Sequence, residues 1–214
     1  LLLLPLLYIC MTVSPRDAGG HAFWFGLGMF LTGTYWIYIS VHVFGNAALW
    51  IAVLLMVGLA VIMATFLAIA GWMISRLSHG EPWLLLFVAP AAWVAIEWLR
   101  GWAFTGFPWL AVGYAQIDGW LAGWAPVLGV YGVSFMLMIS TTAVIAIFMS
   151  RGVARMAGVA ALVLPWLAGG LLQTLDWTEV VGKPVRTSIV QAGVSQDQKW
   201  DLDQRQPIME FYRR

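Results

Sequence analysis

Apolar residues run along most of this chain in stretches long enough to cross a lipid bilayer. A membrane-spanning helix needs about 20 consecutive apolar residues. Polar residues and turn-forming pairs interrupt the apolar pattern at intervals of about that size. The pattern therefore predicts six helices, of which the first is too short to span and is expected to be the remnant of a longer one: 1–13, 22–41, 47–75, 83–100, 127–150 and 156–175.

Residues 101–120 break this pattern because they are rich in Trp, Gly and Pro. Pro108 prevents a regular helix there, and Gly106 lets the backbone turn. Non-helical backbone at membrane depth has to be buried in protein or line a cavity, while aromatic side chains favour the headgroup level. We therefore expect an interfacial or re-entrant segment. Two interpretations stay open for it: an aromatic belt, or a functional cleft that faces lipid.

The chain becomes polar after residue 175. Residues 176–184 have the composition of a linker. Residues 185–191 alternate in polarity and are rich in β-branched side chains, which predicts a strand, and residues 201–214 predict the start of a helix. So short a tail is too small to fold alone, so we expect the strand to join a sheet formed by residues beyond 214. The chain begins inside an apolar run and stops without a turn signal, and we expect a fragment, truncated at both ends.

Charged residues are scarce and unevenly distributed. They make up 10% of the chain, whereas 62% of it is hydrophobic, and an ordinary soluble domain has roughly 25% charged residues. Only nine of the charged residues lie within 1–175, which excludes a soluble globular protein. The net charge of +1 argues against nucleic acid as a partner. One Cys and three scattered His residues provide neither a disulfide framework nor a metal site.

The basic residues of the apolar part predict its orientation in the membrane. Cytoplasmic loops of membrane proteins carry an excess of Lys and Arg. Alternate loops hold most of the basic residues here, and the intervening loops have only Arg100. The loops that carry the excess are expected in the cytoplasm, and residues 176–214 are expected outside, which in a bacterium is the periplasm. The four residues that decide this are Arg16, Arg76, Arg151 and Arg155.

Glu97 and Arg100 are the ionisable residues at membrane depth, three positions apart near the end of the 83–100 helix. Charges at that depth are costly and therefore often functional. Opposite charges at this spacing also form common local pairs on helices, and we favour a structural ion pair that orients the helix. Cys10 lies in an apolar run, where a thiol stays protonated and inert, so we do not expect it to be a nucleophile.

Several motifs together resemble the apolipoprotein N-acyltransferase family, over nearly the whole chain. The most specific feature is the Thr-Gly-Phe-Pro-Trp turn at 105–109, followed later by the Val-Gln and Lys-Trp pairs of the tail. Either half alone would be a weaker signal. The similar segments are 33–38 (GTYWIY), 97–102 (EWLRGW), 105–110 (TGFPWL), 113–116 (GYAQ), 188–193 (SIVQAG) and 199–200 (KW).

The resemblance implies a polytopic helical membrane domain at 1–175, followed from residue 185 by the first elements of an αββα nitrilase-like α/β domain. Such enzymes reside in the bacterial inner membrane and need no cofactor. They move an acyl chain from a phospholipid donor to the N-terminal cysteine of a diacylglyceryl apolipoprotein, through a thioester on the Cys of a Glu-Lys-Cys triad. All three triad residues are expected downstream of residue 214, so this chain alone, with no catalytic residue, is expected to be inactive.

The resemblance also implies where lipid substrates pass. The turn formed by Gly106, Phe107, Pro108 and Trp109, together with Trp200 after Lys199, is expected near the lipid entrance and the active-site cavity. The alternative from another class is a membrane transporter or lipid flippase, whose broken helix at 101–116 would line a substrate path. The polar tail with its predicted strand favours the acyltransferase, since a transporter has little use for it.

The distribution of basic residues among the loops predicts which side of the membrane each loop faces, and this can be tested. Reporter fusions at residue 153 and at residue 195 should report opposite sides of the membrane, with the former cytoplasmic, because the basic loops stay inside and the polar tail is exported. Signals from the same side at both positions would contradict the predicted number of spans.

Overall fold

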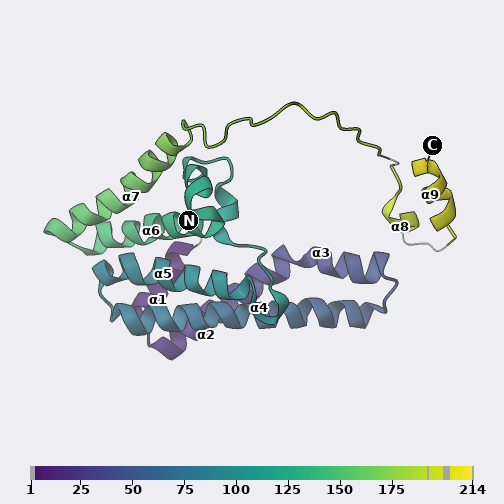
Figure 1. Cartoon of the computed structure of the whole chain (residues 1–214). Coiled ribbons are helices and arrows are strands. Elements are labelled where there is room, and N and C mark those ends of the chain that lie inside the picture. Colours follow the sequence, from purple (N-terminus) through teal and green to yellow (C-terminus); the bar gives the residue numbers. More distant parts are fainter. Residues whose placement is uncertain (1–2, 192, 200–202, 214) are drawn as a thin grey trace.

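The regular secondary structure of the described residues is helical. The computed structural model describes residues 3–191, 193–199 and 203–213, and these ranges contain no strand. The main helices follow one another along the chain (Figure 1). Longer segments lie between α2 and α4 and between α5 and α6. They are α1 (Leu3–Thr12), α2 (Pro15–Gly33), α4 (Leu49–Ser78), α5 (Pro82–Arg100), α6 (Ala125–Met149) and α7 (Gly152–Leu172).

Several of these helices are long and apolar enough to cross a membrane. Among the described residues four qualify by themselves, and a fifth span arises if α2 is counted with the bent continuation formed by α3 (Tyr35–Tyr38) and the π-helical turn η1 (Ile39–Phe44). The bend between the two parts is 50°. The prediction of a multi-pass helical membrane protein is confirmed.

The start of α2 lies earlier than the sequence pattern predicted, at Pro15 instead of residue 22. The Ser14 side chain accepts a hydrogen bond from the backbone N–H of Asp17, as an N-cap residue does. Pro15 follows at the first helical position, where its missing N–H costs nothing. The local capping sequence therefore extends the helix into residues that apolar periodicity alone assigned to a loop.

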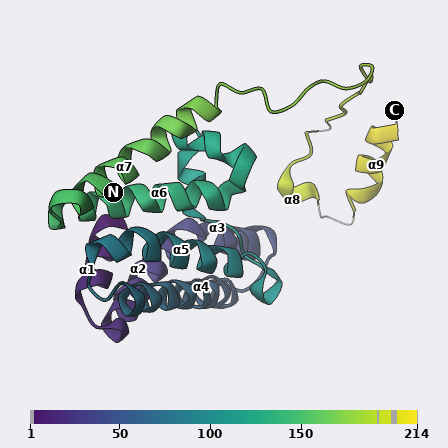
Figure 2. The same ribbon diagram turned by 60° about the vertical axis from the view of Figure 1, so that its left-hand side comes forward.

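The helices form two layers. The first contains α1, α2, α4 and α5, and the second contains α6 and α7 with the short helical turns that precede α6 (Figure 2). Small residues let α2 and α4 approach closely: a Cβ atom on Gly71 would lie 2.5 Å from the Cβ of Ala22. The main core lies among the helices of the first layer and extends to α6, and its fully buried side chains include Leu7, Phe30, Ile74, Leu85 and Met138.

The turns that join α1 to α2, α4 to α5 and α6 to α7 lie at one end of the bundle (Figure 1, left). A hydrogen bond of 2.8 Å from Ser75 Oγ to the carbonyl of Val13 ties two of these turns together. Arg16, Arg76 and Arg151 therefore gather at this end, as the alternation of basic loops requires. The start of α4 lies at the opposite end, beside α3, and the segment after α5 lies part-way along α4 (Figure 1).

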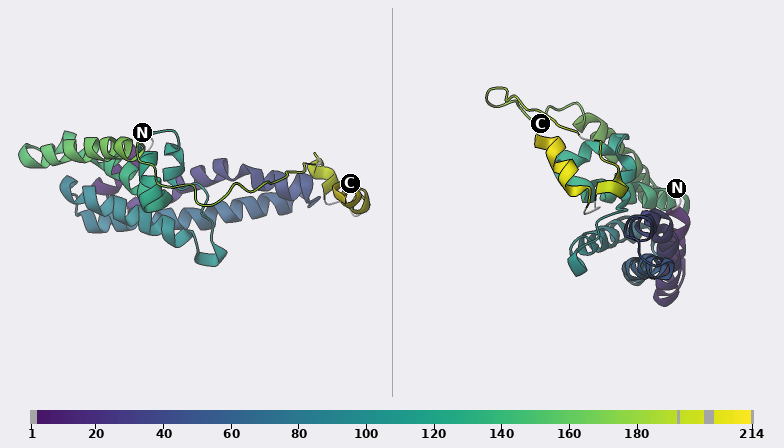
Figure 3. Two further views of the ribbon diagram at one scale, coloured as in Figure 1. Left: turned by 45° about the horizontal axis from the view of Figure 1, so that its top comes forward. Right: turned by 90° about the vertical axis from the view of Figure 1, so that its right-hand side faces the viewer.

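The tail does not test the predicted strand. Residues 185–191, expected to pair with strands beyond residue 214, run here as exposed, irregular chain (Figure 3). A strand is stable only when a neighbouring strand bonds to its backbone, and none exists in the described part of the chain. The short helix α8 (Gln196–Lys199) and α9 (Arg205–Arg213) follow, the latter within the range where a helix was expected.

Candidate functional site

The segment after α5 is a loop with unusual backbone geometry. It passes through the short 3-10 turn η2 (Ala103–Thr105) and continues to the 3-10 turn η3 (Val112–Gln116). Phe104, Thr105 and Leu110 have φ values of 53°, 77° and 61°. Positive φ is uncommon outside Gly and is a clear outlier for a β-branched residue such as Thr. Such strain persists where the surrounding structure holds it, frequently at ligand-binding sites.

Gly106 explains why the loop turns where the sequence predicted. Its φ is 85°, and a Cβ atom there would lie 2.2 Å from the carbonyl oxygen of Gly101. Only glycine fits so close an approach. The backbone N–H of Phe107 then donates to the carbonyl of Arg100 at 2.8 Å, which closes the loop onto the end of α5.

Arg100, the last residue of α5, bonds to the backbone of this loop from beneath. Its side chain is 1% exposed. The Nη1 atom donates to the carbonyl of Phe107 at 2.9 Å and to the carbonyl of Trp109. The guanidinium carbon also lies 5.1 Å from the centre of the Phe30 ring on α2, a cation–π distance. Arg100 thus joins the tip of the loop to two helices.

Glu97, one turn earlier on α5, bonds to the far end of the same loop. It is 3% exposed. Its Oε1 atom accepts a hydrogen bond from the backbone N–H of Val112 at 2.8 Å and another from the indole N–H of Trp93 at 2.9 Å. Hydrogen bonds to a charged group are stronger than neutral ones. We refer to Glu97 and Arg100 together as the clamp and to residues 101–113 as the clamped loop.

The sequence predicted a local ion pair, but in the described structure no direct hydrogen bond joins the two members of the clamp. Glu97 binds a backbone donor of the clamped loop, and Arg100 binds two of its carbonyl acceptors. The charges are therefore used to hold non-helical backbone inside an apolar bundle, where unpaired backbone groups would be costly.

Two further contacts fix the position of the clamped loop. The N–H of Gly113 donates to the buried Ser134 Oγ on α6 at 2.9 Å. Leu110 fills the notch at the end of α2, since a Cβ atom on Gly33 would lie 2.4 Å from Leu110 Cδ1. The loop is thus anchored to α2, α5 and α6, the three helices that surround it.

An aromatic surface forms on the outer side of the clamped loop. The Trp109 side chain is 52% exposed. Its ring centre lies 5.1 Å from that of Phe107 and 6.2 Å from that of Trp36 on α3. We call these three residues the Trp109 cluster. Beside it, a shallow groove is lined by Pro108, Trp109, Leu110 and Tyr114.

The structure gathers most of the residues that the sequence predicted for a lipid path. Gly106, Phe107, Pro108 and Trp109 form one turn above the clamp, whereas Trp200 lies outside the described residues. Sequence reasoning missed the contact of Trp36 with this turn. The 33–38 motif contains that residue, but no spacing rule connects it with a turn so far along the chain. Within the described ranges no group of three His, Cys, Asp or Glu residues could hold a metal ion.

Comparison with known proteins identifies the family. A family model described as the apolipoprotein N-acyltransferase N-terminal domain matches residues 1–143. The chain belongs to the apolipoprotein N-acyltransferase family. The match covers α1 to α5, the clamped loop and most of α6, so that the clamp lies inside the region that defines this family domain.

Curated relatives carry the same family name over a longer sequence. The apolipoprotein N-acyltransferase of Azotobacter vinelandii is 38% identical across the full chain, which covers 42% of that relative. Those of Nitrosomonas europaea and Ralstonia nicotianae are 38% and 40% identical, over 93% and 86% of the chain and 40% and 36% of their own lengths. The chain therefore spans about two fifths of the length of these relatives.

The clamp predicts a local loss of order when Arg100 is replaced. Arg100→Met keeps the approximate length of the side chain but leaves the carbonyls of Phe107 and Trp109 without their donor. Each buried polar group left unsatisfied costs about 1–3 kcal/mol. Hydrogen–deuterium exchange should become faster in peptides that cover residues 101–113.

Arg76→Met is the matched control, because Arg76 is an exposed arginine in the last turn of α4. It should leave exchange in residues 101–113 unchanged. If Arg100→Met left that exchange at the wild-type rate as well, the clamp would not be what holds the loop.

Proposed function

We propose that this chain is the membrane part of a bacterial enzyme that acylates the N-terminal cysteine of diacylglyceryl lipoproteins, with a phospholipid as acyl donor. Membership of the apolipoprotein N-acyltransferase family supports the reaction class. The observation that carries the role of this part is the Trp109 cluster. It is a half-exposed aromatic surface on strained, non-helical backbone at the end of a membrane helix.

On this proposal the protein is a multi-pass protein of the inner membrane. The end of the bundle that gathers Arg16, Arg76 and Arg151 faces the cytoplasm, and the clamped loop lies near the periplasmic surface. Residues 176–214 then continue into the periplasm as a linker and the start of a nitrilase-like domain. An acyl chain that moves from the outer leaflet to a periplasmic active site would pass the level of the Trp109 cluster.

The chemistry itself belongs to residues outside this chain. A cysteine thiol of a Glu-Lys-Cys triad attacks the ester carbonyl of the phospholipid, a thioester forms, and the lysophospholipid leaves with a proton. The α-amino group of the apolipoprotein then attacks the thioester, so that an amide forms and the thiol is regenerated. Such a division between nucleophile, base and oxyanion stabiliser is a common form of covalent catalysis. The 214 residues alone are accordingly expected to show no turnover.

The residues of this chain position substrate. Trp109, Phe107 and Trp36 offer large apolar faces to an acyl chain, and aromatic rings suit the interface between lipid and water. The clamp keeps these faces in one place, because the carbonyls of Phe107 and Trp109 are both bonded to Arg100. We do not favour a transporter, because the family match and the named relatives are apolipoprotein N-acyltransferases.

The proposal predicts that Trp109→Ala and Trp200→Ala, made in the full-length protein, reduce acyl transfer while membrane insertion and protein level stay nearly unchanged. Loss of an aromatic contact of this kind is worth roughly 1–3 kcal/mol, or about ten- to hundredfold in rate when it acts on substrate positioning. The assay would use a phospholipid donor and a diacylated lipopeptide acceptor, with activity expressed per folded molecule.

Trp50→Ala is the matched control for these two variants. Trp50 is 68% exposed in the first turn of α4. It should change neither activity nor protein level. A purely structural role would make all three variants act alike, through stability. Unaltered activity per folded molecule in both Trp109→Ala and Trp200→Ala would refute the lipid-path role.

A further inference from the structure

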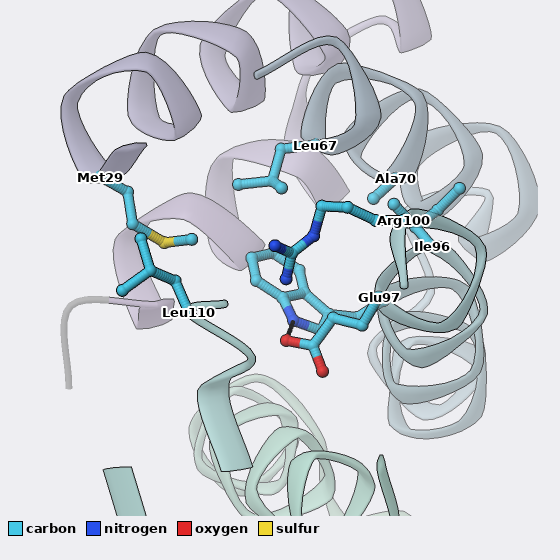
Figure 4. Close-up of a pocket in the computed structure, with 8 residues that line it drawn as sticks. Met29, Leu67, Ala70, Ile96, Glu97, Arg100 and Leu110 are labelled. Carbon is cyan, nitrogen blue, oxygen red and sulfur yellow. Dashed lines mark hydrogen bonds between the residues drawn. The ribbon is translucent and has the colours of Figure 1, made fainter. Parts of the chain in front are cut away.

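A small enclosed cavity lies directly beneath the clamped loop, between α2, α4 and α5 (Figure 4). The space open to the centre of a water molecule is about 10 Å³. A bound water occupies about 10–15 Å³, roughly the volume of one probe sphere. Because the whole 10 Å³ is open to the centre of a water molecule, the cavity has room for a bound water. It is lined by Met29, Leu67, Ala70, Trp93, Ile96, Leu110 and both members of the clamp.

Two polar atoms at this cavity have no partner in the described structure. They are Oε2 of Glu97 and Nε of Arg100, and both are buried. The other carboxylate oxygen of Glu97 and the Nη1 atom of Arg100 are already bonded to the loop and to Trp93. Buried polar atoms in proteins nearly always have a hydrogen-bond partner, and leaving one unpaired is costly. The two unpaired atoms therefore point to an occupant.

The chemistry of the two atoms selects the occupant. The Nε–H group of Arg100 can only donate a hydrogen bond, and the carboxylate oxygen of Glu97 accepts one. A water molecule does both at once. A cation would be repelled by Arg100, an anion would be repelled by Glu97, and an organic ligand would not fit the volume.

We propose that one buried water molecule occupies this cavity, accepts a hydrogen bond from Arg100 Nε–H and donates one to Glu97 Oε2. The water joins the two charges, which have no direct hydrogen bond to each other. It completes the clamp as a single hydrogen-bonded unit that runs from Val112 through both side chains to Trp109. This inference rests on the geometry of the cavity and is independent of the acyltransferase proposal.

The test is a crystal or cryo-electron microscopy structure of the full-length protein at a resolution that shows ordered water. We expect one peak in the cavity, within hydrogen-bond distance of both Arg100 Nε and Glu97 Oε2. A cavity without density would overturn the proposal, and so would a direct contact between the two side chains that closes it.

A pair of variants separates a specific site from ordinary packing. Ala70 lines the cavity from α4, so the added methyl groups of Ala70→Val should fill it and remove the peak. Ala60 is buried on the same helix but does not line the cavity. Ala60→Val should therefore keep the water. Density that stays in place in Ala70→Val would contradict the assignment, and if that variant does not fold, the wild-type map alone decides.

Discussion

A charged side chain buried in an apolar bundle is stable only when it is hydrogen-bonded. For Glu97 and Arg100 the main partners are backbone groups of one irregular loop. Arg100 bonds to the carbonyls of Phe107 and Trp109, and Glu97 bonds to the N–H of Val112. The dependence is mutual. The loop would leave its own backbone groups unpaired at membrane depth without the two side chains. The helical bundle can therefore tolerate the irregular segment between α5 and η3, because the end of α5 carries two charges.

This arrangement links the bundle to its proposed task. The clamp lies inside the bundle and bonds to the carbonyls of Phe107 and Trp109. The side chains of these two residues belong to the Trp109 cluster on the outer side of the loop. Backbone strain at Thr105 and Leu110 is held by the same contacts, together with Ser134 and the notch at Gly33. A rigid aromatic surface at the edge of a membrane domain suits a lipid that must move from the bilayer toward a soluble active site.

The helices and the broken segment could be predicted from the sequence, because apolar run length, Pro108 and Gly106 act locally. The hydrogen-bond partners of Glu97 and Arg100 could not be predicted, because a spacing of three residues suggests that the two side chains bond to each other. In the structure each of them bonds to backbone groups of the clamped loop. Trp36 reaches Trp109 only because α2 bends after Gly33. The strand predicted for 185–191 stays a prediction, because its partner strands were expected beyond residue 214 and an alternating segment without a neighbouring strand runs as irregular chain.

If the clamp acts through the position of Trp109, then Arg100 and Trp109 are energetically coupled, and a double-mutant cycle measures that coupling. Acyl transfer would be measured in the full-length enzyme for Arg100→Met, Trp109→Ala and the double variant, per folded molecule. We expect non-additivity of about 1 kcal/mol or more: Arg100→Met should lower the rate in the wild-type background and add little once Trp109 is gone. Losses that simply add would show that the two residues act independently and that the clamp does not work through Trp109.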